Sequence, residues 1–237
     1  MSGLRNLMMN QLRSYDPDAQ AYLTAAGITD LTQKTAVNQL VLDLKAYGLW
    51  TKFYGLWPYV GGTAGSHSYN LKNPGLYQIT WSGGITHDAN GVTFDGINGF
   101  GNTGFNASTE GWTSVDQGIC LYRRDNVLGA SPNYDMGCST STNFEVSYLI
   151  SRFYDGNSYC KLGSDVAASI VNGNGHGFHV GNREGGNIVH YRNGNILISA
   201  AVGCVALYNG NVFVGAVNRG GVADFYSGIN GSNQINV

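Results

Sequence analysis

The chain has 237 residues, of which 43% are hydrophobic and 12% charged, and its formal net charge is −2. A globular chain usually carries about twice that share of charged residues. Because the net charge is close to zero, the composition excludes a global field that would attract nucleic acid or an anionic membrane. Glycine is abundant, with 35 residues against 4 prolines, which favours a chain that turns often, as all-β proteins do.

The N-terminus shows no sign of export or membrane insertion. No apolar run reaches the roughly 18 residues of a transmembrane helix, and residues 1–16 lack the apolar core and small residues of a secretory signal. Residues 4–13 place Leu4, Leu7, Met8 and Leu12 on one face if they are helical. The sequence leaves open whether this segment is a helix or a frayed terminus.

Two helices are predicted next. Asp16 is an N-cap followed by proline at the first helical position, and Gly27 ends that helix. Asp30 begins a helix over 30–47, with Gln33 at the capping-box position. Apolar residues recur along this second helix at helical spacing, and they are Val37, Leu40, Val41, Leu44 and Tyr47.

The segment 48–67, GLWTKFYGLWPYVGGTAGSH, marks a change of structure. Trp50, Phe53 and Trp57 extend the helical spacing by a turn or two, and Pro58 then forbids continuation. The period changes from 3.6 to 2 after Pro58. We therefore predict a helical segment at 1–58 and a β-sandwich at 59–237, with the aromatic residues buried where the two meet.

Short runs rich in β-branched and aromatic residues alternate with glycine and asparagine clusters beyond Pro58, as expected for an antiparallel sandwich. The predicted strands are 76–81, 91–95, 117–123, 143–153, 177–182, 187–192, 195–200 and 211–217. Asn193 and Gly194 predict a type I′ hairpin turn between two of them.

Several motifs resemble a group of bacteriophage virion proteins in which helices precede a concanavalin A-like (laminin-G-like) β-sandwich. The resemblance runs from DPDAQAYLTAAGITDLTQKTAV through the junction to ITWSGGITHDANGVTFDGINGFGNTGFN, GFHVGNREGGNIVHYRNGNILIS and NVFVGAVNRGGVADFYSG, covering about residues 16–228. It implies a mainly β fold, an antiparallel jelly roll of the concanavalin A type after a short α-helical N-terminal segment.

The resemblance also implies a function. It suggests a non-enzymatic virion structural protein (spike, fibre or head decoration), made in the host bacterial cytoplasm and located in the virion. Its partners would be other virion proteins, further copies of itself and a host-surface glycan, without nucleic acid or membrane insertion. The candidate assembly residues are Val37, Leu40, Leu44, Trp50 and Trp57.

The chain departs from this group at its C-terminus. Members continue past the FYSG-like strand into a final strand and a helix, whereas this chain ends in the polar tail SGINGSNQINV. Either another chain closes the sheet edge, or this form lacks the helix. Because open sheet edges invite pairing, an assembly partner is the hypothesis that follows.

Two other functions make predictions that the residues can test. A soluble carbohydrate-binding module of a cell-surface protein predicts an upstream signal peptide or linker, which the chain does not show. A glycanase predicts two carboxylates flanking the bond, but the nearest pattern, from Glu145 to Ile150, has one, and Glu110 and Glu184 stand alone.

No cofactor is predicted. Cys120, Cys138, Cys160 and Cys204 form no CxxC pair, so we interpret them as reduced, buried side chains. His176 and His179 should point to opposite faces of a strand, which makes them poor co-ligands. Calcium binding is an alternative to turn chemistry at three aspartates beside glycine-containing turns, Asp88, Asp95 and Asp155.

A ligand-binding face is the remaining expectation. In 143–153, alternation predicts that Phe144, Val146, Tyr148 and Ile150 face the core, and that Glu145, Ser147 and Ser151 face solvent or a ligand. The candidate ligand-binding residues are Tyr122, Arg124, Glu145, Ser147, Arg183 and Tyr191.

Overall fold

A computed structural model describes residues 15–129, 132–142, 146–226 and 233–236. The predicted segment 4–13 lies outside these residues. Both predicted helices are confirmed, as α2 (Pro17–Ala25) and α3 (Leu31–Ala46). Asp16 accepts a hydrogen bond from the N–H of Asp18, and Asp30 accepts one from Gln33. Gly27 and Gly48 follow with φ of 66° and 68°, a conformation that glycine adopts without steric cost.

The two helices form a small core of their own. Val37 and Val41 of α3 pack with Tyr22 of α2, while Lys45 pairs with Asp16 at 2.6 Å. The predicted capping box is not formed in full, because the Gln33 amide oxygen accepts from the N–H of Gly61 at 3.0 Å. That bond ties α3 to the loop that leads into the sandwich.

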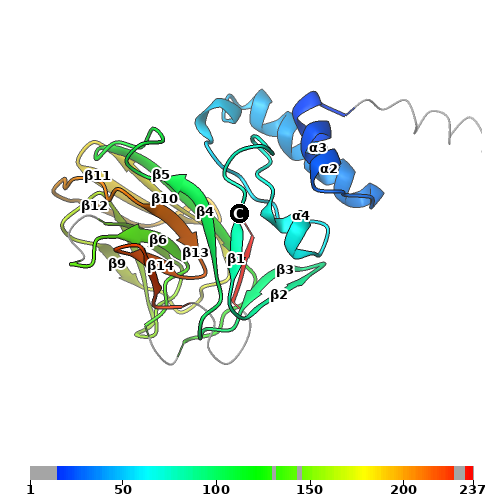
Figure 1. Ribbon diagram of the computed structural model, residues 1–237. Helices are drawn as coiled ribbons and strands as arrows, with labels where there is room; N and C mark the ends of the chain where they lie inside the picture. The colour runs from blue at the N-terminus through cyan, green and yellow to red at the C-terminus, as the bar shows by residue number, and fades with distance from the viewer. Residues whose placement is uncertain (1–14, 130–131, 143–145, 227–232, 237) are drawn as a thin grey trace, which may run out of the picture.

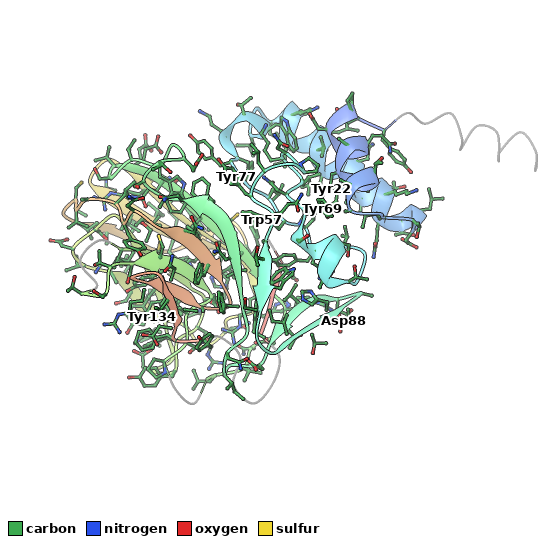
Figure 2. The ribbon with its side chains drawn as sticks, viewed as in Figure 1. Tyr22, Trp57, Tyr69, Tyr77, Asp88 and Tyr134 are labelled. Carbon is green, nitrogen blue, oxygen red and sulfur yellow. The ribbon has the colours of Figure 1, made fainter. Side chains whose placement is uncertain are left out.

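The aromatic junction joins the helical core to the sandwich core, as predicted. After the 3₁₀ turn η1 (Trp50–Lys52), Trp50 packs with the helices, and Trp57 packs within the sandwich. The indole N–H of Trp57 donates to the carbonyl of Tyr77 at 3.0 Å, and Figure 2 shows both residues between the helices and the strands. The helical core also includes Leu71, which lies beyond the predicted boundary at residue 58 and just after α4 (Ala64–Ser68).

Two sheets account for the strands in the described part of the chain, and α2 and α3 lie beside them (Figure 1). The first sheet has the order β1 (Thr80–Ser82), β4 (Phe100–Asn106), β13 (Asn211–Val214), β6 (Met136–Ser139), β7 (Val146–Ile150), β8 (Asn157–Leu162) and β9 (Ala168–Val171), with β14 (Val217–Arg219) and β15 (Val222–Asp224) joined through β6. The second has the order β12 (Asn195–Ala201), β11 (Asn187–Arg192), β10 (Gly177–Glu184), β5 (Asp116–Arg123), β16 (Asn233–Asn236), β3 (Gly91–Phe94) and β2 (Ile85–Asp88).

The sheets pack face to face as a mainly antiparallel, β-sandwich-like structure. Strands β5, β10 and β11 contact β7 and β8 across the interior. Leu121 and Ile188 of one sheet meet Leu149 and Leu162 of the other in a continuous apolar core. The β11–β12 hairpin turns at Asn193 and Gly194 with positive φ at both residues, as predicted.

Some strand boundaries differ from the prediction. Tyr77 has a φ of 54°, so the strand expected over 76–81 begins only at Thr80. The segment 211–217 is interrupted at Gly215, where φ is 75° and the N–H donates to the carbonyl of Asp135. The turn divides that segment into β13 and β14.

The predicted orientation of 143–153 was wrong for its described part. Ser147 and Leu149 face the interior, and the Ser147 hydroxyl donates to Gln117 on the opposite sheet at 2.6 Å. Tyr148 points to the other side, where its ring contacts Tyr134 with centroids 4.8 Å apart. Because further chain covers that face as well, alternation of polar and apolar residues did not distinguish inside from outside.

The polar C-terminal tail has a role that the sequence did not reveal. Strand β16 lies between β3 and β5, pairing Gln234 with Thr93 and Ile235 with Arg123. The expected open edge at this position is therefore occupied by the tail of the same chain.

Candidate binding site

One face of the second sheet carries a row of apolar and aromatic side chains directed away from the core. Alternation along β5 and β10 sends Leu121 and His179 inward, and it sends Tyr122, Phe178 and Val180 outward. Cross-strand register places Tyr122 opposite Phe178, and Val180 opposite Tyr191. We call Tyr122, Phe178, Val180, Tyr191 and Ile196 the outer row.

The outer row is accessible. Phe178 is 42% exposed and Ile196 is 61% exposed, whereas Tyr122, Val180 and Tyr191 are half-buried. Ile196 lies on β12 opposite Tyr191, so the row crosses four neighbouring strands from β5 to β12. Exposed apolar patches that are larger than a few hundred Å² mark interaction surfaces, which makes this face the candidate surface.

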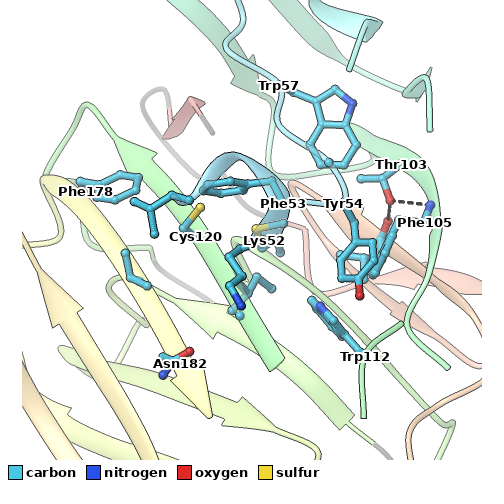
Figure 3. Close-up of a pocket in the computed structure, with 17 residues that line it drawn as sticks. Lys52, Phe53, Tyr54, Trp57, Thr103, Phe105, Trp112, Cys120, Phe178 and Asn182 are labelled. Carbon is cyan, nitrogen blue, oxygen red and sulfur yellow. Dashed lines mark hydrogen bonds between the residues drawn. The ribbon is translucent and has the colours of Figure 1, made fainter. Parts of the chain in front are cut away.

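A cavity of about 420 Å³ opens at one end of the outer row, beneath the aromatic junction. Its walls come from the junction, from the β4 region and from β5 and β10, as Figure 3 shows. Aromatic rings make up much of the lining, and they are Phe53, Tyr54, Trp57, Phe105, Trp112 and Phe178. The volume lies within the range of pockets that bind small molecules.

The polar atoms deep in this cavity are already paired. The Thr103 hydroxyl donates to the carbonyl of Val212 at 2.7 Å and accepts from the N–H of Phe105 at 3.1 Å. Burial raises the pKa of the Cys120 thiol to about 12, so that group is neutral at physiological pH. Tyr54 and Trp112 add a hydroxyl and an indole N–H to the lining, and Lys52 and Asn182 add an ammonium group and an amide (Figure 3).

The structure brings two of the predicted ligand residues together and separates the others. Tyr122 and Tyr191 both belong to the outer row. Arg124 is exposed, and its guanidinium donates to the carbonyl of Asn90. Glu145 lies outside the described residues.

Ser147 and Arg183 lie inside the protein, away from any surface ligand. Ser147 is 2% exposed and Arg183 is fully buried. The Arg183 guanidinium donates to carbonyl oxygens from three segments and to the Cys204 sulfur at 2.8 Å. Both residues belong to strands whose inward faces are polar at these positions, which the sequence pattern did not show.

The candidate assembly residues also include both buried and exposed side chains. Val37, Trp50 and Trp57 are buried within this chain, and Leu44 is partly buried against the helical core. Leu40 remains 36% exposed, and nearby Tyr47 is 78% exposed. Among the five candidates, Leu40 therefore offers the most surface to another protein.

Two pairs of histidines, of which His67, His179 and His190 are buried and His87 is half-buried, were not predicted. His179 Nδ1 lies 3.0 Å from His190 Nε2, and His67 Nδ1 lies 3.1 Å from His87 Nδ1. Burial lowers the pKa of His179 to about 4 and that of His190 to about 3. Burial and the neighbouring His87 together lower the pKa of His67 to about 4.

The aspartates considered for calcium take part in turns. Asp95 accepts hydrogen bonds from the N–H groups of Ile97, Asn98 and Gly99. Asp88 accepts from Asn90, and Asp155 accepts from Asn157. No group of three or more His, Cys, Asp or Glu side chains suited to a metal occurs within the described residues.

The cysteines are free thiols, as predicted, but they are not all buried. Cys138 and Cys160 lie in the core, whereas Cys204 is exposed. Cys204 follows β12 in a loop, near the Arg183 guanidinium. The prediction of burial was therefore confirmed for Cys138 and Cys160 and wrong for Cys204, and Cys120 is intermediate.

No protein-family model and no curated protein sequence matches the chain. Across the part of the chain that the structure describes, no helix has both the length and the apolar character needed to cross a membrane.

Proposed function

We propose that this protein is a non-enzymatic bacteriophage virion component that uses the outer row to bind a host-surface glycan. The observation that carries the proposal is the outer row itself, because it presents Tyr122, Phe178 and Tyr191 on one accessible sheet face. Aromatic rings combine a large apolar face with polar edges, which suits the mixed surface of a sugar ring. The virion assignment and the concanavalin A-like jelly roll rest on the motif resemblance.

The outer row is tested by removing its two tyrosines. We expect Tyr122→Ala with Tyr191→Ala to lower glycan affinity by about tenfold or more, since each aromatic contact contributes roughly 1 kcal/mol. A glycan array followed by calorimetry on the best hit measures the effect. Tyr154→Ala is the matched control, because Tyr154 is 44% exposed but lies outside the outer row.

A glycan that binds the double variant as tightly as the unchanged protein would show that the outer row is not the glycan site. The absence of any glycan hit with the unchanged protein would remove the glycan from the proposal.

The helical unit supports assembly into a larger particle. Leu40 and Tyr47 lie seven residues apart, near one helical stripe, and both remain exposed. We expect the full chain to be an oligomer in light scattering, and Leu40→Asp with Tyr47→Asp to shift it to a monomer. The same mass for both proteins would contradict assembly through this stripe, and Thr32→Asp is the control on an exposed position of the same helix.

A further inference from the structure

We infer that the cavity beneath the aromatic junction binds a small amphipathic carboxylate, an apolar chain or ring that ends in an anionic group. This site differs from the glycan-binding outer row, although Phe178 and Val180 border both. The inference goes beyond the proposed function and stands even if the outer row binds no glycan.

The size of the cavity sets the size of the ligand. Its volume of about 420 Å³ equals the liquid-state share of about 14 water molecules. A molecule of roughly a dozen non-hydrogen atoms fits such a space and remains well inside the usual range of ligand pockets.

The residues that line the cavity determine the chemistry of the part of the ligand that is buried. Met136, Ile119 and Val212 join the aromatic rings, and the polar groups of Thr103, Trp57 and Tyr54 are hydrogen-bonded within the protein. The Trp112 indole adds one N–H donor, fewer partners than the several hydroxyl groups of a sugar need. A sugar ring in this position would bury hydroxyl groups without partners, at about 1–3 kcal/mol each. The interior therefore favours an apolar body over a carbohydrate.

The charged and polar groups of the lining determine the chemistry of the other end of the ligand. Lys52 is the cation of the lining, and Asn182 adds an amide that donates hydrogen bonds. None of the described residues that line the cavity carries a carboxylate. Figure 3 shows Lys52 between Phe53 and Trp112, with Asn182 on the strand below, so an anionic head group meets donors on leaving the aromatic zone.

A glycine keeps part of the cavity wall open. Gly118 lies on β5 and lines the cavity, and a Cβ added there would meet no atom within 4 Å. Its neighbour Gln117 points inward, so residue 118 points to the outside of the sheet. A longer side chain at this position would project into the cavity without straining the backbone.

Decanoate is the probe for the test, because it joins an apolar chain to a carboxylate. We expect saturable binding of decanoate to the full chain. Calorimetry and tryptophan fluorescence measure it, since Trp57 and Trp112 line the cavity. Gly118→Leu should weaken binding by at least about tenfold, because the new side chain occupies the ligand volume. Its melting temperature should stay equal or rise, since replacing glycine in a strand lowers the entropy of the unfolded chain.

Gly186→Leu is the matched control, because a Cβ at Gly186 also meets nothing within 4 Å and Gly186 does not line the cavity. We expect this variant to bind decanoate like the unchanged protein. Lys52→Met should weaken binding by about fivefold, the scale of one partly screened charge-assisted contact. Decylammonium should bind at least about fivefold more weakly than decanoate, for the same reason.

Four results would overturn the inference, and the first three concern decanoate and its analogue. They are the absence of saturable decanoate binding, equal binding by the Gly118→Leu and Gly186→Leu variants, and decylammonium binding as tight as that of decanoate. Protein that sediments with anionic phospholipid vesicles but does not bind free decanoate would also overturn it, in favour of a lipid-surface contact. The Tyr122 and Tyr191 double variant leaves the cavity interior intact, so failure of glycan binding and failure of decanoate binding are separate outcomes.

Discussion

Replacing Arg183 with methionine is expected to lower the free energy of unfolding by about 3–5 kcal/mol, since removing one member of a buried, hydrogen-bonded charge site leaves its partners unpaired. The guanidinium of Arg183 is fully buried and donates to the carbonyls of Leu162, Gly163, Gly185 and Gly203. These carbonyls lie on β8, on the loop after it, on the β10–β11 turn and on the loop after β12. One side chain thereby holds segments of both sheets in place.

The physical reason for so large a loss is the number of carbonyl groups that depend on one residue. Each carbonyl left without a donor in the interior costs about 1–3 kcal/mol, and methionine fills a similar volume without donating. The substitution also removes the free-energy cost of burying a charge, which offsets part of this loss. The net loss is a large fraction of the roughly 5–15 kcal/mol that stabilises a domain.

Urea denaturation of the full chain measures this effect. Arg124→Met is the control, since Arg124 is exposed and should change the unfolding free energy by less than about 0.5 kcal/mol. Arg183→Lys should show an intermediate loss, because a single ammonium cannot reach every carbonyl that the planar guanidinium reaches. Equal stability of the Arg183→Met and Arg124→Met variants would refute the structural role assigned to Arg183.

Acidification from pH 6.5 to pH 5.0 is expected to destabilise the protein by about 3–5 kcal/mol, given about 1.4 kcal/mol per pKa unit for each group. The contributing groups are His67, His179 and His190, which are fully buried. Their pKa values are lowered from 6.5 to about 4, 4 and 3. In this range they are neutral in the folded protein and protonated in the unfolded chain.

The sign follows from the proton balance. The unfolded state binds more protons below pH 6.5, so acid shifts the equilibrium toward unfolding until the folded-state pKa values are reached. His87, whose pKa is also lowered by burial, acts in the same direction. The aspartates with lowered pKa values, Asp16, Asp95 and Asp155, contribute mainly below this range because their ordinary value is 3.8.

The pH dependence of the unfolding free energy, measured in urea at intervals between pH 7.5 and 5.0, tests this expectation. His190→Gln should reduce the slope near pH 5 by up to about one proton per molecule, whatever its effect on stability at neutral pH. His176→Gln is the control, since His176 is exposed. A stability that stays constant across this range would contradict neutral buried histidines.

Features governed by neighbouring residues could be predicted from the sequence. Asp16 and Asp30 begin the helices, Gly27 and Gly48 end them, and Asn193 with Gly194 turns the hairpin. Caps and tight turns depend on φ and on hydrogen bonds within a few residues. The strands 91–95, 117–123 and 187–192 were found because their apolar alternation is strong.

Strands with a weak local signal were missed. Strand β4 contains two glycines and two asparagines, and β6 reads MGCS, so neither shows the β-branched alternation used to find strands. Strand β16, with the sequence NQIN, is polar and forms where β3 and β5 both leave backbone groups to pair. These elements depend on neighbours that are distant in the sequence.

The candidate site shows the same division. The sequence pointed to Tyr122 and Tyr191 one at a time, but cross-strand register was needed to place them in one row with Phe178. It also pointed to Ser147 and Arg183, which the fold buries.

By itself, then, the sequence determined where α2 and α3 begin and end, and that the later part of the chain forms antiparallel sheets. It placed the change from helical to extended structure at Pro58, whereas α4 follows Pro58 and the first strand begins at Thr80. Tertiary structure alone decided which polar side chains are buried and which histidines pair. It also decided where the aromatic junction leaves a cavity. The reason is physical: caps and turns follow from local hydrogen bonds and allowed dihedral angles, whereas burial depends on which segments cover a face.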